Sequence, residues 1–510
     1  MSEQATKPTT FAVTTLGCKV NQADSEAIGD QMNAAGFEQR EFHEQADIYI
    51  VNTCTVTHLG DRSSRQLIAQ AHRHHPDALL VVTGCYAELN PNAVAALPGV
   101  DLVVGNSGKA NLVETITQHL SEEQNEPGRD SNRDSNETIT QHFQANQQPT
   151  TDVSTRPTEK RFAQRLPVVS LDMLHIGSDR DLALQADEGE PQPDNPSALA
   201  PFDNTVSENA RARIFSRTRV QMKVQDGCNN RCTYCIVPSV RGQSRSRSIS
   251  SVVEHVQRKA RAGYQEIVLT GIHLGDYHPD GNKSLDLGDL IDALLRETDI
   301  ARIRVSSLEP EDFRLEWLEL WKNPRMCRHL HLPMQSGSDA ILRKMARRYT
   351  SERYRTIVKT AQQLVPGIAI STDIITGFPG ETDEDFELTY QAAQELAFAK
   401  MHVFRFSPRQ GTAAARMRGQ VKDAIKKERS QRLLDLNETQ SRAFRQQFLG
   451  ETLDVLIEQQ KQGVWEGLTD NYLRVAVHDL PDTRQDWQHT LVKARLTHLI
   501  EDGVYGIYVE

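Results

Sequence analysis

Three cysteines stand within eight residues of the chain, in the spacing C-x3-C-x2-C. Cys228, Cys232 and Cys235 follow directly on a β-like run, Arg219 to Val224. Thiolates this close together can hold three corners of a cubane [4Fe-4S] cluster, whose fourth iron is then left without a protein ligand. Structural zinc is the alternative, although it normally needs four Cys or His ligands and no fourth cysteine lies nearby. The loop therefore favours a fold that places a metal centre at the end of a strand.

Five more β-like runs follow, separated by helical stretches, and each ends at a distinctive loop. They are Glu266 to Thr270, Arg302 to Ser306, His329 to Met334, Ile368 to Ile375 and Lys400 to Phe406. In barrels of parallel strands the loops at the carboxyl ends carry the chemistry. The pattern predicts a partial (β/α)6 barrel over residues 211–445, ending in a basic helix from Arg416 to Arg445.

A second group of cysteines lies near the N-terminus. Apolar runs alternate with helix-like stretches over residues 9–120, which predicts an α/β domain with a parallel sheet. The clearest runs are Ala12 to Leu16, Asp47 to Val51 and Ala78 to Val82. A turn residue and then a cysteine follow each run, at Cys18, Cys54 and Cys85. Ligands of open α/β sheets bind beyond the carboxyl ends of the strands, so these cysteines could share one site; three buried, unreactive thiols are the alternative.

The net charge of -11 is concentrated in one segment of the 510-residue chain. Residues 121–210 contain 17 acidic and 7 basic side chains, 8 of the 21 prolines, and no Trp, Tyr or Cys. Such a composition cannot bury enough apolar area to offset chain entropy, so we expect a largely disordered linker. The rest of the chain is close to neutral, and the overall charge does not exclude a nucleic-acid partner.

The chain ends in short β-like runs that predict a small β-barrel over residues 448–510. The runs are Leu453 to Ile457, Tyr472 to Val477, Leu491 to Leu496 and Val504 to Val509. The predicted fold class is α/β: an N-terminal parallel-sheet domain and a partial (β/α)6 barrel, followed by this C-terminal β-barrel.

No apolar run approaches the roughly 18 residues that a membrane-spanning helix needs, and the first residues lack the basic and apolar regions of a secretory signal. The seven cysteines are few and odd in number, which is typical of a reducing compartment. We therefore expect a cytoplasmic protein without a membrane partner.

The C-x3-C-x2-C loop at the first strand of a β/α barrel resembles that of the radical S-adenosylmethionine (SAM) enzymes. The resemblance implies that the three cysteines of this loop hold a [4Fe-4S] cluster whose free iron binds SAM. It also implies that Tyr234, between the last two cysteines, packs near the adenine of SAM. Gly271 and Gly275 belong to a segment, Thr270 to Tyr277, that resembles the Gly-rich part of the family that approaches the methionine amino group.

The N-terminal segments around Cys18, Cys54 and Cys85 are similar to the N-terminal domain of the methylthiotransferases, and residues 448–510 resemble the TRAM module of the same proteins. The resemblance implies a second [4Fe-4S] cluster on these three cysteines. In that family one SAM methylates a sulfide at this cluster, and a second SAM gives the radical that removes the C2 hydrogen of adenine. An electron donor protein and a sulfur source are implied as further partners.

Two segments bear on the substrate. Gly17-Cys18-Lys19-Val20-Asn21-Gln22 and Cys327 to Pro333 resemble the branch that acts on N6-threonylcarbamoyladenosine at position 37 of tRNA, beside the anticodon. The isopentenyladenosine branch, with Gln-Met after the first cysteine, and the ribosomal-protein branch are alternatives within the family. A non-catalytic metal-binding RNA-binding protein is the alternative of another class, and it would not explain six distinctive loops at one face of a barrel.

A basic stretch lies beside the C-x3-C-x2-C loop. Residues 211–250 contain nine Arg or Lys residues and one acidic residue. This density beside a site is typical of phosphate contacts, and a solvated basic surface is the alternative. We expect Arg241, Arg245 and Arg247 to contact the tRNA backbone.

Overall fold

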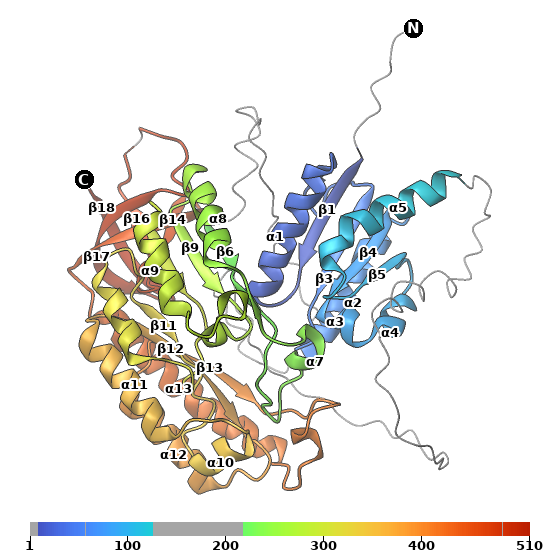
Figure 1. The fold of residues 1–510 in the computed structure, drawn as a ribbon. Helices are drawn as coiled ribbons and strands as arrows, with labels where there is room; N and C mark the ends of the chain where they lie inside the picture. The colour runs from blue at the N-terminus through green and yellow to red at the C-terminus, as the bar shows by residue number, and fades with distance from the viewer. Residues whose placement is uncertain (1–8, 57, 126–217, 482) are drawn as a thin grey trace.

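The computed structural model describes residues 9–56, 58–125, 218–481 and 483–510. Three bodies follow one another along the chain (Figure 1): an α/β domain in blue and cyan, a larger α/β domain in green to orange, and a small β-barrel in red. The predicted linker lies outside the described residues, apart from 121–125. Those five belong to helix α5 (Leu112–Asn125), whose buried face of Leu112 and Ile116 continues at Leu120, so the first domain extends past the predicted boundary at 120.

The N-terminal sheet is parallel, in the order β2-β1-β3-β4-β5. Its three central strands match the predicted runs, and β2 and β5 are short edge strands whose sequences carry no clear alternation. The bounds are β1 Thr10–Thr15, β2 Glu38–Arg40, β3 Ile48–Thr53, β4 Leu79–Gly84 and β5 Leu102–Val104. The register pairs Thr15 with Asn52 and Asn52 with Thr83, so the central strands end level with one another.

Helices cover both faces of this sheet and bury two apolar clusters, one on each side, as expected for a parallel sheet. Besides α5, they are α1 Lys19–Ala34, α2 His58–His74, α3 Cys85–Leu89 and α4 Pro91–Ala95. Alternation along β3 shows the two sides: Tyr49 and Val51 pack in one cluster, and Ile48 and Ile50 pack in the other.

The central domain contains two three-stranded parallel sheets, β6-β9-β10 and β11-β12-β13. A parallel bridge between Ser307 and His331 joins them at β10 and β11. The bounds are β6 Arg219–Lys223, β9 Glu266–Thr270, β10 Arg302–Val305, β11 His329–His331, β12 Ala369–Thr376 and β13 Lys400–Arg405. All six predicted runs are strands; β11 ends before Met334 because Pro333 has no N–H to donate to a neighbouring strand.

Helices of the central domain pack on the outer side of these strands (Figure 1). They are α8 Ile249–Arg261, α9 Leu287–Glu297, α10 Asp339–Lys344, α11 Ser351–Leu364, α12 Asp383–Leu396 and α13 Asp423–Gln446. The short helix α7 Val237–Arg241 lies instead beside α3 of the N-terminal domain. The last helix begins at Asp423 rather than at the predicted Arg416. Gly419, at a φ of +79°, lies between a short 3-10 turn at Ala414–Arg416 and α13, and this backbone conformation prevents one continuous helix.

The C-terminal strands form a closed barrel in the order β14-β15-β16-β18-β17. Their bounds are β14 Thr452–Lys461, β15 Val464–Thr469, β16 Arg474–His478, β17 Leu491–Ile500 and β18 Gly503–Val509. The predicted β-barrel is present, with β15 as an additional strand. The predicted start at Tyr472 is wrong, because that residue has a φ of +67° and belongs to the turn before β16.

This barrel is bound to the amino ends of the central strands. Arg302, the first residue of β10, donates to the carbonyl oxygens of Leu468 at 3.1 Å and Asp454 at 2.7 Å. Arg328, just before β11, donates to both carboxylate oxygens of Asp470 at 2.7 and 3.0 Å. The carboxyl ends of the six strands therefore remain available for a site. Within the described residues, no helix combines the length and apolar character needed to cross a lipid bilayer.

Candidate active site

The C-x3-C-x2-C loop lies at the carboxyl end of β6. A two-residue ladder between β7 (Gln225–Asp226) and β8 (Arg245–Ser246) fixes the base of the loop. The N–H of Cys228 donates to Gly242 O at 3.0 Å, and the N–H of Cys235 donates to Cys232 O at 3.1 Å. The loop is therefore held tightly by its own backbone, and its three cysteines are brought to one place.

Electrostatics around these thiols match a cluster-binding site. Burial, with Glu309 and Glu311 nearby, raises the pKa of Cys232 to about 11, and burial with the neighbouring thiols raises that of Cys235 to about 12, so three thiolates here need a compensating positive charge. Arg347 supplies part of it, with Nη1 3.7 Å from Cys232 Sγ, and the N–H of Asn230 donates to Cys228 Sγ at 3.4 Å. N–H groups donated to ligand sulfurs are a common means of tuning iron-sulfur clusters.

The spacing of the sulfurs also bears on the choice of metal. A tetrahedral zinc ion with Zn–S distances of about 2.3 Å requires sulfurs less than about 4 Å apart. In the described part of the chain, neither cysteine triad brings three sulfur atoms within 4.8 Å of one another. As they lie here, the sulfurs of each triad are therefore spaced more widely than a single zinc ion requires.

The residues predicted to bind SAM lie beside this loop. Tyr234 is buried and packs edge-on against Phe378, with ring centroids 6.3 Å apart. Gly271 and Gly275 allow close approaches, because a Cβ at Gly271 would lie 2.8 Å from Gln225 Oε1 and a Cβ at Gly275 would lie 2.9 Å from Asp312 Cβ. These positions agree with a cofactor site at the barrel mouth, and the contacts to SAM remain a prediction.

Several polar residues near the loop were not identified from the sequence. Arg347 is buried and pairs with Glu309 at 2.7 Å and Glu311 at 3.6 Å, both from the loop after β10. Gln335, after β11, is buried with a φ of +58°, and its Oε1 has no hydrogen-bond partner among the described residues; the same holds for Glu311 Oε2. For Glu309, Glu311 and Gln335 the only sequence signal was a position after a strand, which applies equally to every residue of those loops, and Arg347, between α10 and α11, had no such signal.

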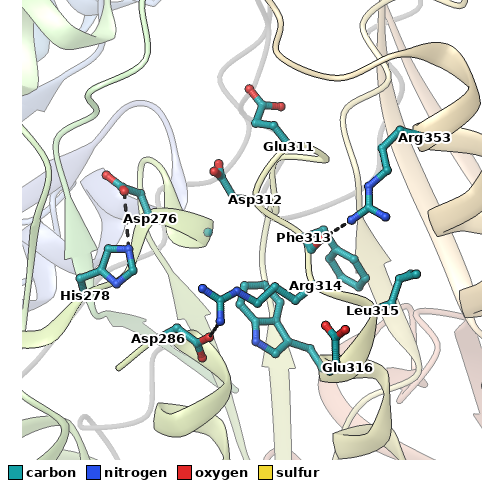
Figure 2. Close-up of a pocket in the computed structure, with 12 residues that line it drawn as sticks. Asp276, His278, Asp286, Glu311, Asp312, Phe313, Arg314, Leu315, Glu316 and Arg353 are labelled. Carbon is teal, nitrogen blue, oxygen red and sulfur yellow. Dashed lines mark hydrogen bonds and ion pairs between the residues drawn. The ribbon is translucent and has the colours of Figure 1, made fainter. Parts of the chain in front are cut away.

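A pocket of about 390 Å³ opens next to this site, between the loops after β9 and β10 (Figure 2). Its wall carries the ion pair of Arg314 with Asp286 at 2.7 Å and the contact of His278 with Asp276 at 4.0 Å. Gly275 also lines the pocket, which connects it to the segment predicted to approach SAM.

The three N-terminal cysteines converge as the sequence predicted. Cys18 precedes α1, Cys54 follows β3 and Cys85 begins α3, each at the carboxyl end of a central strand. A Cβ at Gly17 would lie 3.2 Å from Cys54 Sγ, and burial together with Cys85 and Cys18 raises the pKa of Cys54. The nitrogen of the Asn106 side chain donates to Cys85 Sγ at 3.5 Å, so this triad too has an amide directed at a sulfur.

Contacts between the two domains lie beside both cysteine triads. Val56, two residues after Cys54, packs on the apolar cluster that contains Tyr234, and Cys232 and Cys235 pack on the same cluster. Arg409, from the loop after β13, donates to Thr55 Oγ1 and pairs with Asp61 at 3.3 Å. The Asn106 side chain also donates to Val240 O at 2.8 Å. Direct contacts therefore hold both triads at one interdomain site.

The predicted RNA-contacting arginines differ in exposure. Arg241 is buried and pairs with Asp24 at 2.9 Å and Asp226 at 3.3 Å, so the prediction that it contacts tRNA is wrong: its guanidinium joins the two domains instead. Arg245 is 60 % exposed, and Arg247 is half-buried by hydrogen bonds to Ser251. Cys327 is buried away from both triads, as expected for a packed thiol.

Comparison with known proteins agrees with this geometry. Residues 222–393 match the radical SAM superfamily, and residues 10–105 match the uncharacterized protein family UPF0004. The fold resembles that of the radical S-adenosylmethionine methyltransferase TsrM from Kitasatospora setae, at a TM-score of 0.50, 18 % identity, and coverage of 80 % of this chain and 75 % of that one. The barrel and its cysteine loop thus define a radical SAM enzyme, a class that uses SAM and a [4Fe-4S] cluster.

Full-length relatives narrow the class. The chain is 35 % identical to the threonylcarbamoyladenosine tRNA methylthiotransferase MtaB of Bacillus subtilis, over 93 % of this chain and 91 % of that protein. It is 29 % identical to the tRNA-2-methylthio-N(6)-dimethylallyladenosine synthase of Pelotomaculum thermopropionicum, over 88 % of this chain and 87 % of that protein. The chain belongs to the family of radical SAM tRNA methylthiotransferases.

Proposed function

We propose that this enzyme adds a methylthio group to C2 of N6-threonylcarbamoyladenosine at position 37 of tRNA. The observation that carries the proposal is the convergence of two cysteine triads at one interdomain site, because the reaction must deliver both a radical and a sulfur atom to one carbon. The similarity to the Bacillus subtilis MtaB over nearly the whole chain supports the threonylcarbamoyl substrate.

The target carbon explains why two cofactor sites are needed. A C2–H bond of adenine has no acidic proton and no leaving group, so acid-base or nucleophilic side chains cannot activate it. SAM and two [4Fe-4S] clusters, when bound, supply the radical and the methylthio group. Cys228, Cys232 and Cys235 would hold the cluster that binds SAM, and the N-terminal triad would hold the second.

The remaining residues of the site position these groups and exclude water. Arg347 and Asn106 direct N–H groups at a sulfur of each triad, which orients the ligands. Tyr234, Val56 and Phe378 form an apolar layer beside the first triad, which limits the access of water to a reactive radical.

The tRNA partner would approach the exposed basic residues near the interdomain site. Arg245 lies there with most of its side chain in solvent, which suits a phosphate contact, and Arg247 is its half-buried neighbour. An electron donor protein and a sulfur source complete the reaction, for which we infer a cytoplasmic setting.

The test is anaerobic reconstitution followed by nucleoside mass spectrometry. The full chain with iron and sulfide should hold about eight irons. With SAM, a reductant and a tRNA carrying N6-threonylcarbamoyladenosine, it should form the 2-methylthio derivative, and Cys228→Ala should abolish this product. Product on isopentenyladenosine tRNA alone would contradict the substrate assignment, and a preparation that binds zinc alone would contradict the reaction class.

A further inference from the structure

The strands of the central domain turn polar side chains toward the inside of the partial barrel. On each strand, alternate residues pack outward on the helices in one apolar core, including Val220, Met222, Ile267, Leu269, Ile303, Val305, Leu330, Ile370, Ile374 and Met401. The residues between them point to the opposite face, because side chains alternate along a strand. Polar residues here occupy an interior that branched apolar side chains usually fill.

Polar side chains of neighbouring strands contact one another in this interior. Tyr472, from the C-terminal barrel, enters at the amino end: its hydroxyl accepts from Arg219 Nη1 at 3.0 Å, and its ring lies 4.6 Å from that of His329. Ring nitrogens of His329 and His331 lie 3.2 and 2.9 Å from Ser371 Oγ. One polar interior therefore extends from β6 to β12.

Three polar atoms of this interior are buried without a hydrogen-bond partner in the described part of the chain. They are Gln221 Oε1, Ser306 Oγ and His329 Nδ1, on residues that are 6 %, 3 % and 6 % exposed. A buried polar atom left unpaired costs about 1–3 kcal/mol, so native proteins usually pair such atoms with a neighbour, a water or a ligand. Three together indicate a chamber with a polar occupant.

Lys19 brings a basic side chain to the same interior. It begins α1 directly after Cys18, and α1 is joined to β6 by the ion pair of Asp24 with Lys223. Burial lowers the pKa of the Lys19 amine from its ordinary value, and the groups that act on it electrostatically, Tyr472, Arg219, Arg304 and Glu266, all belong to this interior. Its side chain makes no hydrogen bond or ion pair within the described residues.

The other charged groups of the interior already have partners. Arg304 donates to Glu266 Oε1 at 2.7 Å, and His331 Nε2 lies 3.3 Å from Asp373 Oδ2. His402 completes a group with these last two residues, whose ligand atoms lie within 4.8 Å of one another. Among the described residues, the amine of Lys19 is thus a basic group of this interior without a hydrogen bond or ion pair, and it stands next to a cysteine of the N-terminal triad.

We propose that Lys19, Gln221, Ser306 and His329 form a chamber that binds the N6 substituent of the target adenosine, with Lys19 pairing with its carboxylate. This inference rests on the proposed function. The threonylcarbamoyl group offers a carboxylate, a hydroxyl and a ureido group for these partners. An isopentenyl group offers none, and a site that leaves buried polar groups unpaired rejects such an analogue strongly.

A two-by-two comparison of enzyme and substrate tests the pairing. The full-length reconstituted enzyme and Lys19→Met are assayed on tRNA carrying N6-threonylcarbamoyladenosine and on the same tRNA with the threonyl carboxylate converted to a neutral carboxamide. Each single change should lower kcat/KM about 100-fold, because each removes one partner of a charged pair. Lys19→Met assayed on the carboxamide tRNA should show a kcat/KM little lower than either single change gives. If the two changes instead lower kcat/KM by the product of their separate effects, the pairing of Lys19 with the carboxylate is overturned.

Controls separate this inference from the proposed function. Lys283→Met, an exposed lysine of the same domain, should behave like the unmodified enzyme on both tRNAs. Gln221→Leu, on β6 and away from the cysteines, should lower kcat/KM on the natural tRNA about tenfold at unchanged iron content. If the unmodified enzyme makes product equally well from the natural tRNA and the carboxamide tRNA, the chamber assignment is wrong and the proposed function still stands. If it makes no product from threonylcarbamoyladenosine tRNA, the proposed function fails.

Discussion

Arg241 of the central domain pairs with Asp24 of the N-terminal domain, Nη1 to Oδ2, at 2.9 Å. The side chains are 1 % and 2 % exposed, and Lys109 and Lys223 pair with the same carboxylate. A buried carboxylate needs such partners, because transfer of a charge out of water costs several kcal/mol. The pair therefore fixes the position of α1, and with it Cys18, relative to the loop that carries the other cysteine triad.

The first prediction concerns the stability of this interface. Arg241→Ala should lower the free energy of unfolding by about 3 kcal/mol, because it leaves Asp24 and Asp226 with fewer partners in a buried position. Urea denaturation of the chain measures the effect. The matched control is Arg245→Ala, which removes an exposed side chain and should change the free energy of unfolding by less than about 1 kcal/mol. In the same variant, the slope of the logarithm of the tRNA binding constant against the logarithm of salt concentration should become shallower by about 1. Equal stability losses would contradict the buried role of Arg241.

The second prediction concerns pH. The neighbouring Lys109, Arg241 and Lys223 hold the pKa of Asp24 well below its usual range. The unfolded chain therefore binds this proton first as the pH falls, so the stabilisation is complete above about pH 5 and is lost progressively below about pH 4. In urea unfolding of cluster-free protein, the free energy of unfolding should fall with decreasing pH below pH 4. This fall should be less steep in Asp24→Asn, by about 1.4 kcal/mol per pH unit. Identical slopes would show that Asp24 is not the titrating group.

The third prediction separates the two cysteine triads. Cys54→Ala should reduce the iron content from about eight to about four atoms per chain. It should still cleave SAM to 5′-deoxyadenosine under reducing conditions, because the C-x3-C-x2-C loop is intact, but it should give no methylthio product. Iron analysis, chromatography and nucleoside mass spectrometry provide the three measurements. Cys327→Ala, a buried thiol outside both triads, should keep the full iron content, and a loss of iron there would contradict the assignment.

The fourth prediction uses two glycines with similar φ values. Gly84 and Gly36 have φ values of +99° and +90°, but a Cβ at Gly84 would lie 2.3 Å from Thr53 O, whereas a Cβ at Gly36 meets no atom within 4 Å. Gly36→Ala should cost about 1 kcal/mol through its backbone conformation alone. Gly84→Ala should cost about 3 kcal/mol and displace Cys85, with loss of about half the iron. Equal stability of the two variants would show that β3 and β4 do not approach as closely as described.

The local pattern of the chain predicts a large part of the fold. The six runs of the central domain and the three central strands of the first domain are clear because their apolar stretches are bounded by turn residues, and parallel strands are buried on both faces. Short edge strands such as β2 carry no such pattern, and neither does β15. The cysteine positions were also visible, since each follows the end of a strand.

The tertiary structure decided what each charged and polar side chain does. Arg241 and Arg245 are four residues apart in one basic stretch, yet one is buried against Asp24 and the other lies in solvent. Only the packing of α1 on β6 distinguishes them, because exposure depends on contacts between segments that are some 200 residues apart in the sequence. The polar interior of the barrel has the same origin: the sequence determines which residues alternate on each strand, and only the joining of six strands buries polar atoms of Gln221, Ser306 and His329 without a protein partner among the described residues.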